Sequence, residues 1–161
     1  MATQFLIMTS ENSSGLSHLK IVSFNLHGFN QGCVTIENLI NEIEPDILLI
    51  QEHWLTPANL NKFDKFSKYF TFRCSAMSAA VESVLLKGRP FGGLMAIIIK
   101  KLHQITETIY CAERCCIVEV SDCIIINIYL PCSGTTNRYD IIEDLLADSG
   151  RGVSDFLLVN V

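Results

Sequence analysis

Long apolar runs are missing from this chain, although 49% of its 161 residues are hydrophobic. A helix that crosses a bilayer needs about 20 consecutive apolar residues, and the nearest candidate, residues 92–99, is far too short. The N-terminal segment also lacks the basic start, apolar core and cleavage site of a signal peptide. We therefore expect no contact with membranes and an intracellular location, nuclear or cytoplasmic.

Charged residues are scarce as well, at 18%, and the net charge is −5. Proteins that bind DNA mainly through its phosphates carry a basic surface, so the overall charge argues against DNA as a partner. A local exception is the run that contains Lys62, Lys65, Lys68 and Arg73. This run fits a basic stripe or an ordinary solvated face, and the second interpretation is the simpler one.

Cysteine spacing typical of a zinc site is also missing. The chain has seven cysteines, an odd number. They do not form the two Cys-x2-Cys pairs that are common in zinc sites. Cys111, Cys115 and Cys116 come nearest to a cluster, but they fall in an expected hairpin without a second pair. Free and mostly buried thiols are the simplest interpretation.

The chain length predicts a single domain. Residues 1–18 are expected to be a disordered leader and residues 19–161 the folded part. Alternating or continuous apolar runs predict strands, and apolar residues at helical spacing predict helices. The expected strands are residues 19–25, 47–52, 69–74, 94–100, 104–110, 115–120, 123–130 and 155–159, and the expected helices are residues 35–43, 56–63 and 138–148.

The segment of residues 45–55, Pro-Asp-Ile-Leu-Leu-Ile-Gln-Glu-His-Trp-Leu, is central to the prediction. Its run of large aliphatic residues predicts a strand that is buried on both faces. A helix at residues 35–43 between this strand and the previous one implies parallel pairing with a right-handed connection. The ends of the two strands then meet at one edge of the sheet, so Asn25 and Glu52 are expected to face one crevice.

Three polar residues end apolar strands: Asn25, Glu52 and Tyr129. Each of them alone fits an ordinary role, as a turn former, a solvated carboxylate or an amphipathic packing residue. A carboxylate at the end of a buried strand is also well placed to hold a hard cation. The segments around the three residues decide between these interpretations.

These segments resemble a known family, in order and in spacing. They are residues 21–30 (Ile-Val-Ser-Phe-Asn-Leu-His-Gly-Phe-Asn), 45–55, 88–97 (Gly-Arg-Pro-Phe-Gly-Gly-Leu-Met-Ala-Ile) and 127–132 (Asn-Ile-Tyr-Leu-Pro-Cys). The Gln-Glu and Asn-x-Tyr-x-Pro pieces are similar to the metal-dependent endonuclease/exonuclease/phosphatase superfamily. The Gly-Arg-Pro-Phe-Gly-Gly and Tyr-Leu-Pro-Cys pieces resemble most the endonuclease domains of non-LTR (LINE-type) retrotransposons.

The resemblance implies an α/β fold, a four-layer sandwich of two mixed β-sheets flanked by helices. It implies a Mg²⁺-dependent phosphodiesterase that nicks DNA, with catalytic residues Asn25, Glu52 and Tyr129. Glu52 would be the Mg²⁺ ligand, because a carboxylate suits a hard cation that also binds phosphate oxygens. Asn25 would bind the phosphate or orient a catalytic Asp, and Tyr129 would stabilise the phosphorane oxygens.

Two parts of the family pattern, a Gly-Asp-x-Asn motif and an Asp-His pair, are absent from the 161 residues. Asn160 stands where the glycine of the motif would be. We therefore expect a C-terminally truncated copy, in which residues 19–161 are the N-terminal two-thirds of the domain and the second half is incomplete. Its Mg²⁺ site would be weak, and it would lack a general base unless His27 or His53 replaces it. The chain alone is then expected to be inactive.

Two other functions remain open from the sequence. The chain could be a non-catalytic binding or interaction module derived from this fold, or an unrelated small α/β domain with buried thiols. An incomplete second sheet would also leave an apolar strand edge near residues 156–159, and such edges pair with other chains. Self-association is therefore a further expectation.

Overall fold

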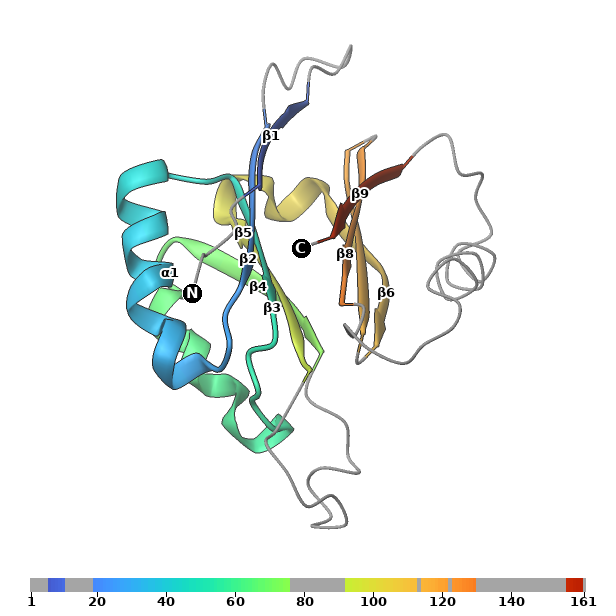
Figure 1. Cartoon of the computed structure of the whole chain (residues 1–161). Helices are drawn as coiled ribbons and strands as arrows, with labels where there is room; N and C mark the ends of the chain where they lie inside the picture. Colours follow the sequence, from blue (N-terminus) through green and yellow to red (C-terminus); the bar gives the residue numbers. More distant parts are fainter. Residues whose placement is uncertain are drawn as a thin grey trace.

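The computed structural model describes residues 6–10, 19–75, 92–112, 114–121, 123–129 and 156–160. These residues form two β-sheets that face each other, with helices on the outer side of the first sheet (Figure 1). The α/β class and the pair of mixed sheets are thus as predicted. The helix expected at residues 138–148 lies outside the described residues.

The first sheet has five strands in the order β1-β2-β3-β5-β4. They are β1 (Leu6–Ser10), β2 (Leu19–Asn25), β3 (Ile47–Gln51), β4 (Phe70–Ser75) and β5 (Leu94–Ile99). Strands β2 and β3 are parallel, as predicted, and the other neighbours in this sheet are antiparallel. The helical connection between β2 and β3 accounts for this, since parallel neighbours need a crossover.

The second sheet has four strands in the order β6-β7-β8-β9. They are β6 (Thr106–Ala112), β7 (Cys115–Val120), β8 (Cys123–Ile128) and β9 (Phe156–Asn160). The first three strands form an antiparallel meander, and β9 pairs with β8 in parallel. Strands β6 and β9 therefore form the two edges of this sheet.

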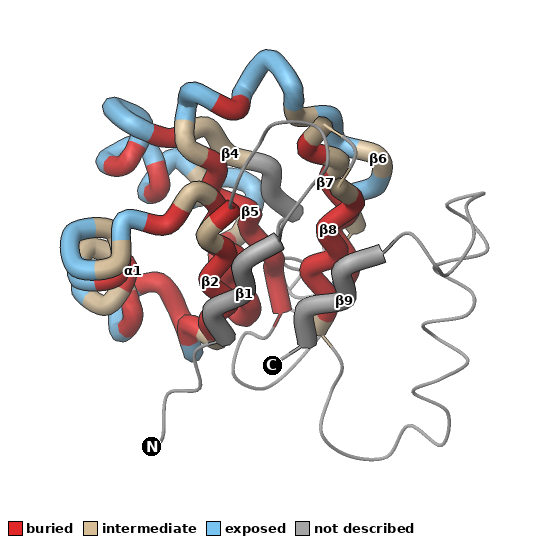
Figure 2. The backbone as a smooth tube through the Cα atoms, turned by 90° about the horizontal axis from the view of Figure 1, so that it is seen from above, coloured by how far each residue is buried: buried red, intermediate tan, exposed pale blue. Residues whose placement is uncertain are grey.

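Strand β3 shows why a continuous apolar run forms a strand here. All five of its residues are buried, and alternate side chains point to opposite faces. Leu48 and Ile50 pack on the helix side, whereas Ile47 and Leu49 pack between the two sheets. Figure 2 shows buried residues along β2, β5, β7 and β8, and exposed residues on parts of the helices and on β6.

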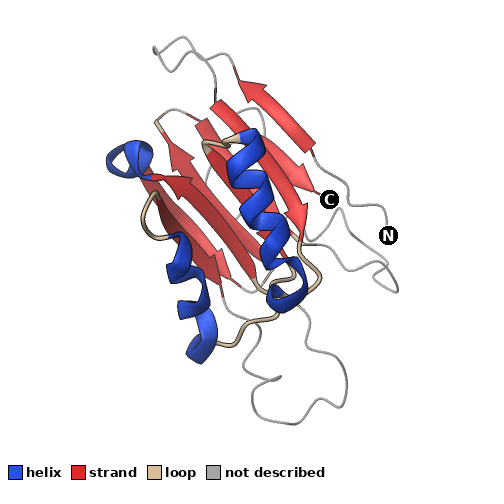
Figure 3. Cartoon of the chain, turned by 90° about the vertical axis from the view of Figure 1, so that its left-hand side faces the viewer, coloured by secondary structure: helices blue, strands red, loops and turns tan. Residues whose placement is uncertain are grey.

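The helical layer consists of α1 (Phe29–Ile43) and the 3-10 helix η1 (Pro57–Phe66), which cover one face of the first sheet (Figure 3). Both bury an apolar side: Ile36 and Leu39 from α1, and Phe63 and Phe66 from η1. A second 3-10 helix, η2 (Lys100–Ile105), connects β5 to β6. None of the helices in the described ranges is long and apolar enough to span a bilayer.

Three local expectations differ from the structure. The first helix begins at Phe29 instead of residue 35, because its first turn is held by the backbone that follows β3. Residues 6–10 of the expected leader form β1, which is stabilised by antiparallel pairing with β2. The segment 100–105 forms η2, so β6 begins two residues later than predicted. Each difference depends on contacts between distant parts of the chain, which local pattern does not report.

Candidate active site

Asn25 and Glu52 lie at one edge of the first sheet, where β2 and β3 end. Asn25 pairs with Gln51 in the parallel register, and the N–H of Leu26 donates to the Gln51 carbonyl at 2.8 Å. Glu52 follows directly after Gln51. The parallel pairing therefore brings these two predicted residues to the same edge.

The backbone after β3 turns sharply and closes the start of α1. The carbonyls of Glu52 and His53 accept hydrogen bonds from the N–H groups of Gly28 and Phe29, at 2.8 and 2.9 Å. These N–H groups belong to the orphan donors at the start of a helix. On the other side, the carbonyl of Gly93 accepts the N–H of His53 at 3.3 Å. The segment is thus held between α1 and β5.

Unfavourable backbone conformations gather at this edge. His27, Glu52 and Trp54 have φ values of 50°, 54° and 54°, in the left-handed region. Such a conformation costs roughly 1–2 kcal/mol for a residue with a side chain. In the described ranges only Glu44 and Ser121 share it among residues other than glycine. Strain of this kind is typical of sites that position a side chain for function.

His27 connects the two predicted residues. Its backbone N–H donates to Asn25 Oδ1 at 3.1 Å, and its Nδ1 lies 3.2 Å from Glu52 Oε2. The His27 side chain is 55% exposed, whereas that of Glu52 is 11% exposed. The carboxylate is therefore largely shielded from water and has an imidazole beside it that reaches solvent.

A buried polar network connects this edge to the second sheet. Gln51 Nε2 donates to Ser23 Oγ at 3.0 Å and to Asn127 Oδ1 at 2.6 Å. Asn127 Nδ2 in turn donates to the carbonyls of Ile50 and Met95, at 3.1 and 3.3 Å. The end of β8 is thus fixed against the end of β3. Composition and periodicity gave no signal for this network, because its partners lie up to 77 residues apart.

Tyr129 follows β8, two residues after Asn127. Residues two apart on a strand share a face, and Tyr129 packs against the apolar cluster between the sheets. Its backbone N–H donates to the Arg114 carbonyl at 3.0 Å. Tyr129 therefore lies on the Gln51 side of the second sheet, linked to the Glu52 edge through Asn127.

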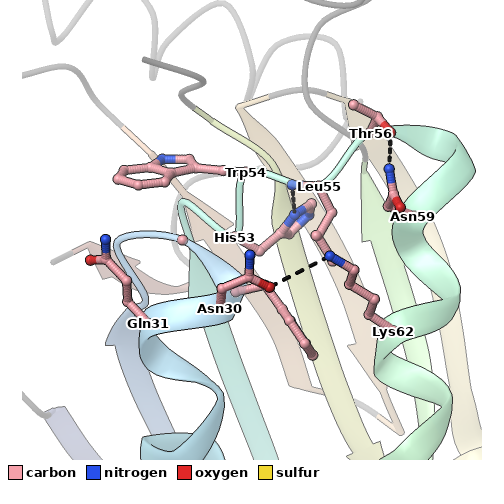
Figure 4. Close-up of a pocket in the computed structure, with 10 residues that line it drawn as sticks. Asn30, Gln31, His53, Trp54, Leu55, Thr56, Asn59 and Lys62 are labelled. Carbon is pink, nitrogen blue, oxygen red and sulfur yellow. Dashed lines mark hydrogen bonds between the residues drawn. The ribbon is translucent and has the colours of Figure 1, made fainter.

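A pocket of about 250 Å³ opens beside this edge, between the start of α1 and η1 (Figure 4). The indole of Trp54 lies over the position of Gly28, where an added Cβ would be 2.4 Å from a ring carbon. The Trp54 Nε1 is buried and has no hydrogen-bond partner among the described residues. Lys62 reaches into the same region, with its Nζ 3.5 Å from Asn30 Oδ1.

The two histidines considered as bases have different environments. His53 is fully buried, its Nδ1 accepts the N–H of Leu55 at 2.9 Å, and its ring packs edge-on against Phe63. A Cβ on Gly93 would lie 2.4 Å from the same ring. His53 is thus a packing residue of the core, and of the two histidines only His27 combines exposure with proximity to Glu52.

The run with Lys62, Lys65 and Lys68 could have formed a basic stripe or an ordinary solvated face, and part of its charge is paired. The Nζ of Lys65 lies 2.6 Å from Glu37 Oε1 and 2.6 Å from Cys33 Sγ. Hydrogen bonds to Cys33 and to Glu37 raise the pKa of Lys65, so its charge is retained but paired. Lys68 lies over the ring of Tyr69. Lys62 lines the pocket beside the Glu52 edge.

A metal at this edge would have few protein ligands. No group of three or more His, Cys, Asp or Glu side chains able to hold a metal occurs in the part of the chain that the structure describes. Glu52 supplies one hard carboxylate, with the Asn25 amide beside it, and Mg²⁺ commonly completes its shell with water and substrate phosphates. The residues fit such a sparse site and no more.

Comparisons with known proteins address the fold. No family model and no curated protein match the chain in sequence. Its structure matches the 3′ phosphatase NExo from Neisseria, solved with a product DNA hairpin, at a TM-score of 0.51 and 16% identity, over 80% of this chain and 48% of that one. It also matches an AP endonuclease from Leishmania major, at a TM-score of 0.55 and 14% identity, over 81% and 46%.

A third match is an AP endonuclease from Archaeoglobus fulgidus, at a TM-score of 0.52 and 16% identity, over 80% of this chain and 48% of that one. The fold is of the endonuclease/exonuclease/phosphatase type. At these identities the likeness concerns the fold alone. The chain spans about half the length of these proteins, with 46% and 48% of them covered.

Proposed function

We propose that this chain carries the Glu52 part of a Mg²⁺-dependent phosphodiesterase site that acts on DNA, of the kind found in the endonuclease domains of non-LTR retrotransposons. The observation that supports the proposal most is the shielded Glu52 carboxylate at the ends of a parallel strand pair, with Asn25 and His27 beside it. The motif resemblance supplies the reaction and the DNA substrate.

Each residue has a role in this proposal. Glu52 would hold the cation, which supplies Lewis-acid stabilisation of charge on the phosphoryl oxygens when bound. Asn25 would donate its amide to a phosphate oxygen, since its Oδ1 already accepts the N–H of His27. Tyr129 would offer its hydroxyl to the oxygens that gain charge in the transition state. The buried network through Gln51 and Asn127 would fix the distance between the two strand ends.

Within the 161 residues, the motif resemblance assigns no general base. The 161 residues contain no Gly-Asp-x-Asn, and positioned general acids or bases each contribute roughly 10² to 10⁴-fold. Among the residues that the structure describes, His27 is the candidate base beside Glu52. The second candidate function is a non-catalytic interaction module, in which the edge strands β6 and β9 would pair with another chain.

Plasmid nicking separates the two functions. We expect the 161-residue chain to nick supercoiled DNA no faster than background in Mg²⁺. The same chain extended by the C-terminal segment of a full-length relative, with Gly-Asp-x-Asn and Asp-His, should nick DNA. In the extended protein, Glu52→Gln should lower the rate at least about 100-fold. Glu44→Gln, at the far end of α1, is the matched control and should leave the rate unchanged.

One outcome contradicts the proposal, and another keeps Glu52 in its role but places the general base within these residues. An extended protein that folds and does not nick DNA would favour the interaction module. Nicking by the 161-residue chain alone, lost in Glu52→Gln, would show that a base lies within it, and His27→Ala then tests the first candidate. Size-exclusion chromatography of the same samples tests the proposed self-association through the edge strands β6 and β9, which the extension should reduce.

A further inference from the structure

A row of three residues crosses the second sheet one strand at a time. Cys111 on β6 pairs with Cys116 on β7, and Cys116 pairs with Asn127 on β8. Directly paired residues point to the same face of a sheet. Asn127 and Cys116 both face the first sheet, so Cys111 stands on that face too. Its strand, β6, is an edge strand of the second sheet.

The two thiols differ in access. Cys111 is exposed, whereas Cys116 is fully buried in the apolar cluster between the sheets. Directly opposite residues of antiparallel strands have Cα atoms about 4.5 or 5.5 Å apart. A disulfide needs about 4.4–6.8 Å. The register therefore allows a bond between these two residues without rearrangement of the hairpin.

The reactivity of the pair is also asymmetric. A hydrogen bond with Cys116 lowers the pKa of the Cys111 thiol, despite the opposing effect of burial. Burial raises the pKa of the neighbouring Cys115 to about 12. The thiolate is the reactive form of cysteine, so Cys111 is the nucleophile of this group. Cys115 packs on the opposite face of the sheet and remains a thiol at neutral pH.

We propose that Cys111 and Cys116 are a redox-active dithiol that a peroxide oxidises to a cross-strand disulfide. The Cys111 thiolate attacks one peroxide oxygen, an S–O bond forms, the O–O bond breaks, and the leaving oxygen takes a proton to become water. The Cys116 sulfur then attacks the Cys111 sulfenic acid, an S–S bond forms, the S–O bond breaks, and the departing hydroxide takes the Cys116 proton. Two thiols and one peroxide thus give one disulfide and two waters.

The disulfide would close the hairpin that holds Tyr129. The Arg114 carbonyl, between the two cysteines, accepts the Tyr129 N–H at 3.0 Å. Cys116 also pairs with Asn127, which binds Gln51. Oxidation therefore covalently fixes the part of the second sheet that contacts the candidate site. The proposal of the dithiol does not depend on the proposed nuclease function.

Thiol counting and peptide mapping test the proposal on the whole chain. After a brief exposure to a small excess of hydrogen peroxide, remaining thiols are alkylated and the protein is cut with trypsin. Because trypsin cleaves after Arg114, a disulfide from Cys111 joins two peptides that are otherwise separate. We expect this joined species, a loss of two titratable thiols from the seven in the chain, and full recovery with dithiothreitol.

Single substitutions identify which cysteine forms the disulfide with Cys111. Cys115→Ser should keep the joined species, and Cys111→Ser and Cys116→Ser should each abolish it. Circular dichroism checks that Cys116→Ser remains folded. If it does not, fragmentation of the joined peptides from the unmodified protein separates Cys115 from Cys116. A bond from Cys111 to Cys115, or a Cys111 that proceeds to sulfinic acid while Cys116 stays alkylatable, would overturn the proposal.

Discussion

Strand β3 has an acidic residue just outside each end, and the two carboxylates have opposite surroundings. Asp46, before the strand, accepts the backbone N–H of Lys20 at 3.0 Å and pairs with Lys101 Nζ at 2.6 Å. Its own N–H and carbonyl are bonded to Lys20 and Ile99. Its polar groups are therefore paired by three different elements.

Glu52, after the strand, is held in a different way. Its backbone has a φ of 54°, and its carboxylate has His27 as its neighbour at 3.2 Å. Next to it, Gln51 Oε1 is buried and has no hydrogen-bond partner among the described residues. One end of the strand is thus arranged for stability, and the other combines strain with incompletely paired polar atoms. This is the pattern expected where a site is built onto a fold at some cost in stability.

The network that holds the Glu52 end in place should have the largest effect on stability. Asn127→Ala leaves Gln51 and the Ile50 carbonyl short of buried partners, so we expect a loss of roughly 3 kcal/mol in the free energy of unfolding. Urea denaturation measures it. Asn59→Ala, which removes an exposed hydrogen bond to Thr56, should cost less than about 0.5 kcal/mol. A loss below about 1 kcal/mol for Asn127→Ala would argue against the network.

Substitution of the two carboxylates tests the comparison directly. Asp46→Ala should lower the free energy of unfolding by about 2 kcal/mol, because it removes a hydrogen bond to a charged acceptor, while the exposed Lys101 adds little. Glu52→Gln should change it by no more than about 0.5 kcal/mol. Urea denaturation of both variants measures the two changes in the free energy of unfolding. Equal losses for the two would remove the distinction between a structural and a functional end.

Backbone strain at Glu52 predicts a gain in stability on substitution. Glu52→Gly should raise the free energy of unfolding by about 0.5–1 kcal/mol, because glycine adopts a positive φ without steric cost. Glu44→Gly is the matched control, since Glu44 ends α1 with a φ of 52° and should give a similar gain. In the extended protein, nicking should fall only for Glu52→Gly. A loss of stability in Glu52→Gly alone would mean that its side chain is structural.

Magnesium should give the smallest effect. About 10 mM Mg²⁺ is expected to raise the free energy of unfolding by less than about 0.5 kcal/mol, as for a ligand whose Kd is near that concentration. Glu52→Gln should abolish the increase, and Asp46→Asn should retain it because Lys101 already occupies the Asp46 carboxylate. Tight stoichiometric binding in titration calorimetry would contradict the view that Glu52 forms a sparse site.

The sequence by itself determined most of the described strands, though not β1, and the strand ends at which Asn25 and Glu52 lie. Runs such as residues 47–51 and 94–99 are apolar throughout, and their burial on both faces follows from that pattern. The helical spacing between β2 and β3 was enough to predict parallel pairing, and with it the shared edge of Asn25 and Glu52. Both predictions rest on local periodicity, which the printed sequence contains in full.

Only the tertiary structure decided how the site is held and what lies around it. Three segments hold the site together: the one after β2, the one after β3 and the one before β5. Bonds between them account for the early start of α1, the strained φ of Glu52 and the proximity of His27. The Gln51–Asn127 bond joins residues 76 apart. The pairing of Cys111 with Cys116 depends on strand register, and a shift of one residue would have placed Cys115 opposite Cys111 instead. Strand register and contacts of this kind depend on which elements pack together, and the local sequence pattern does not contain that information.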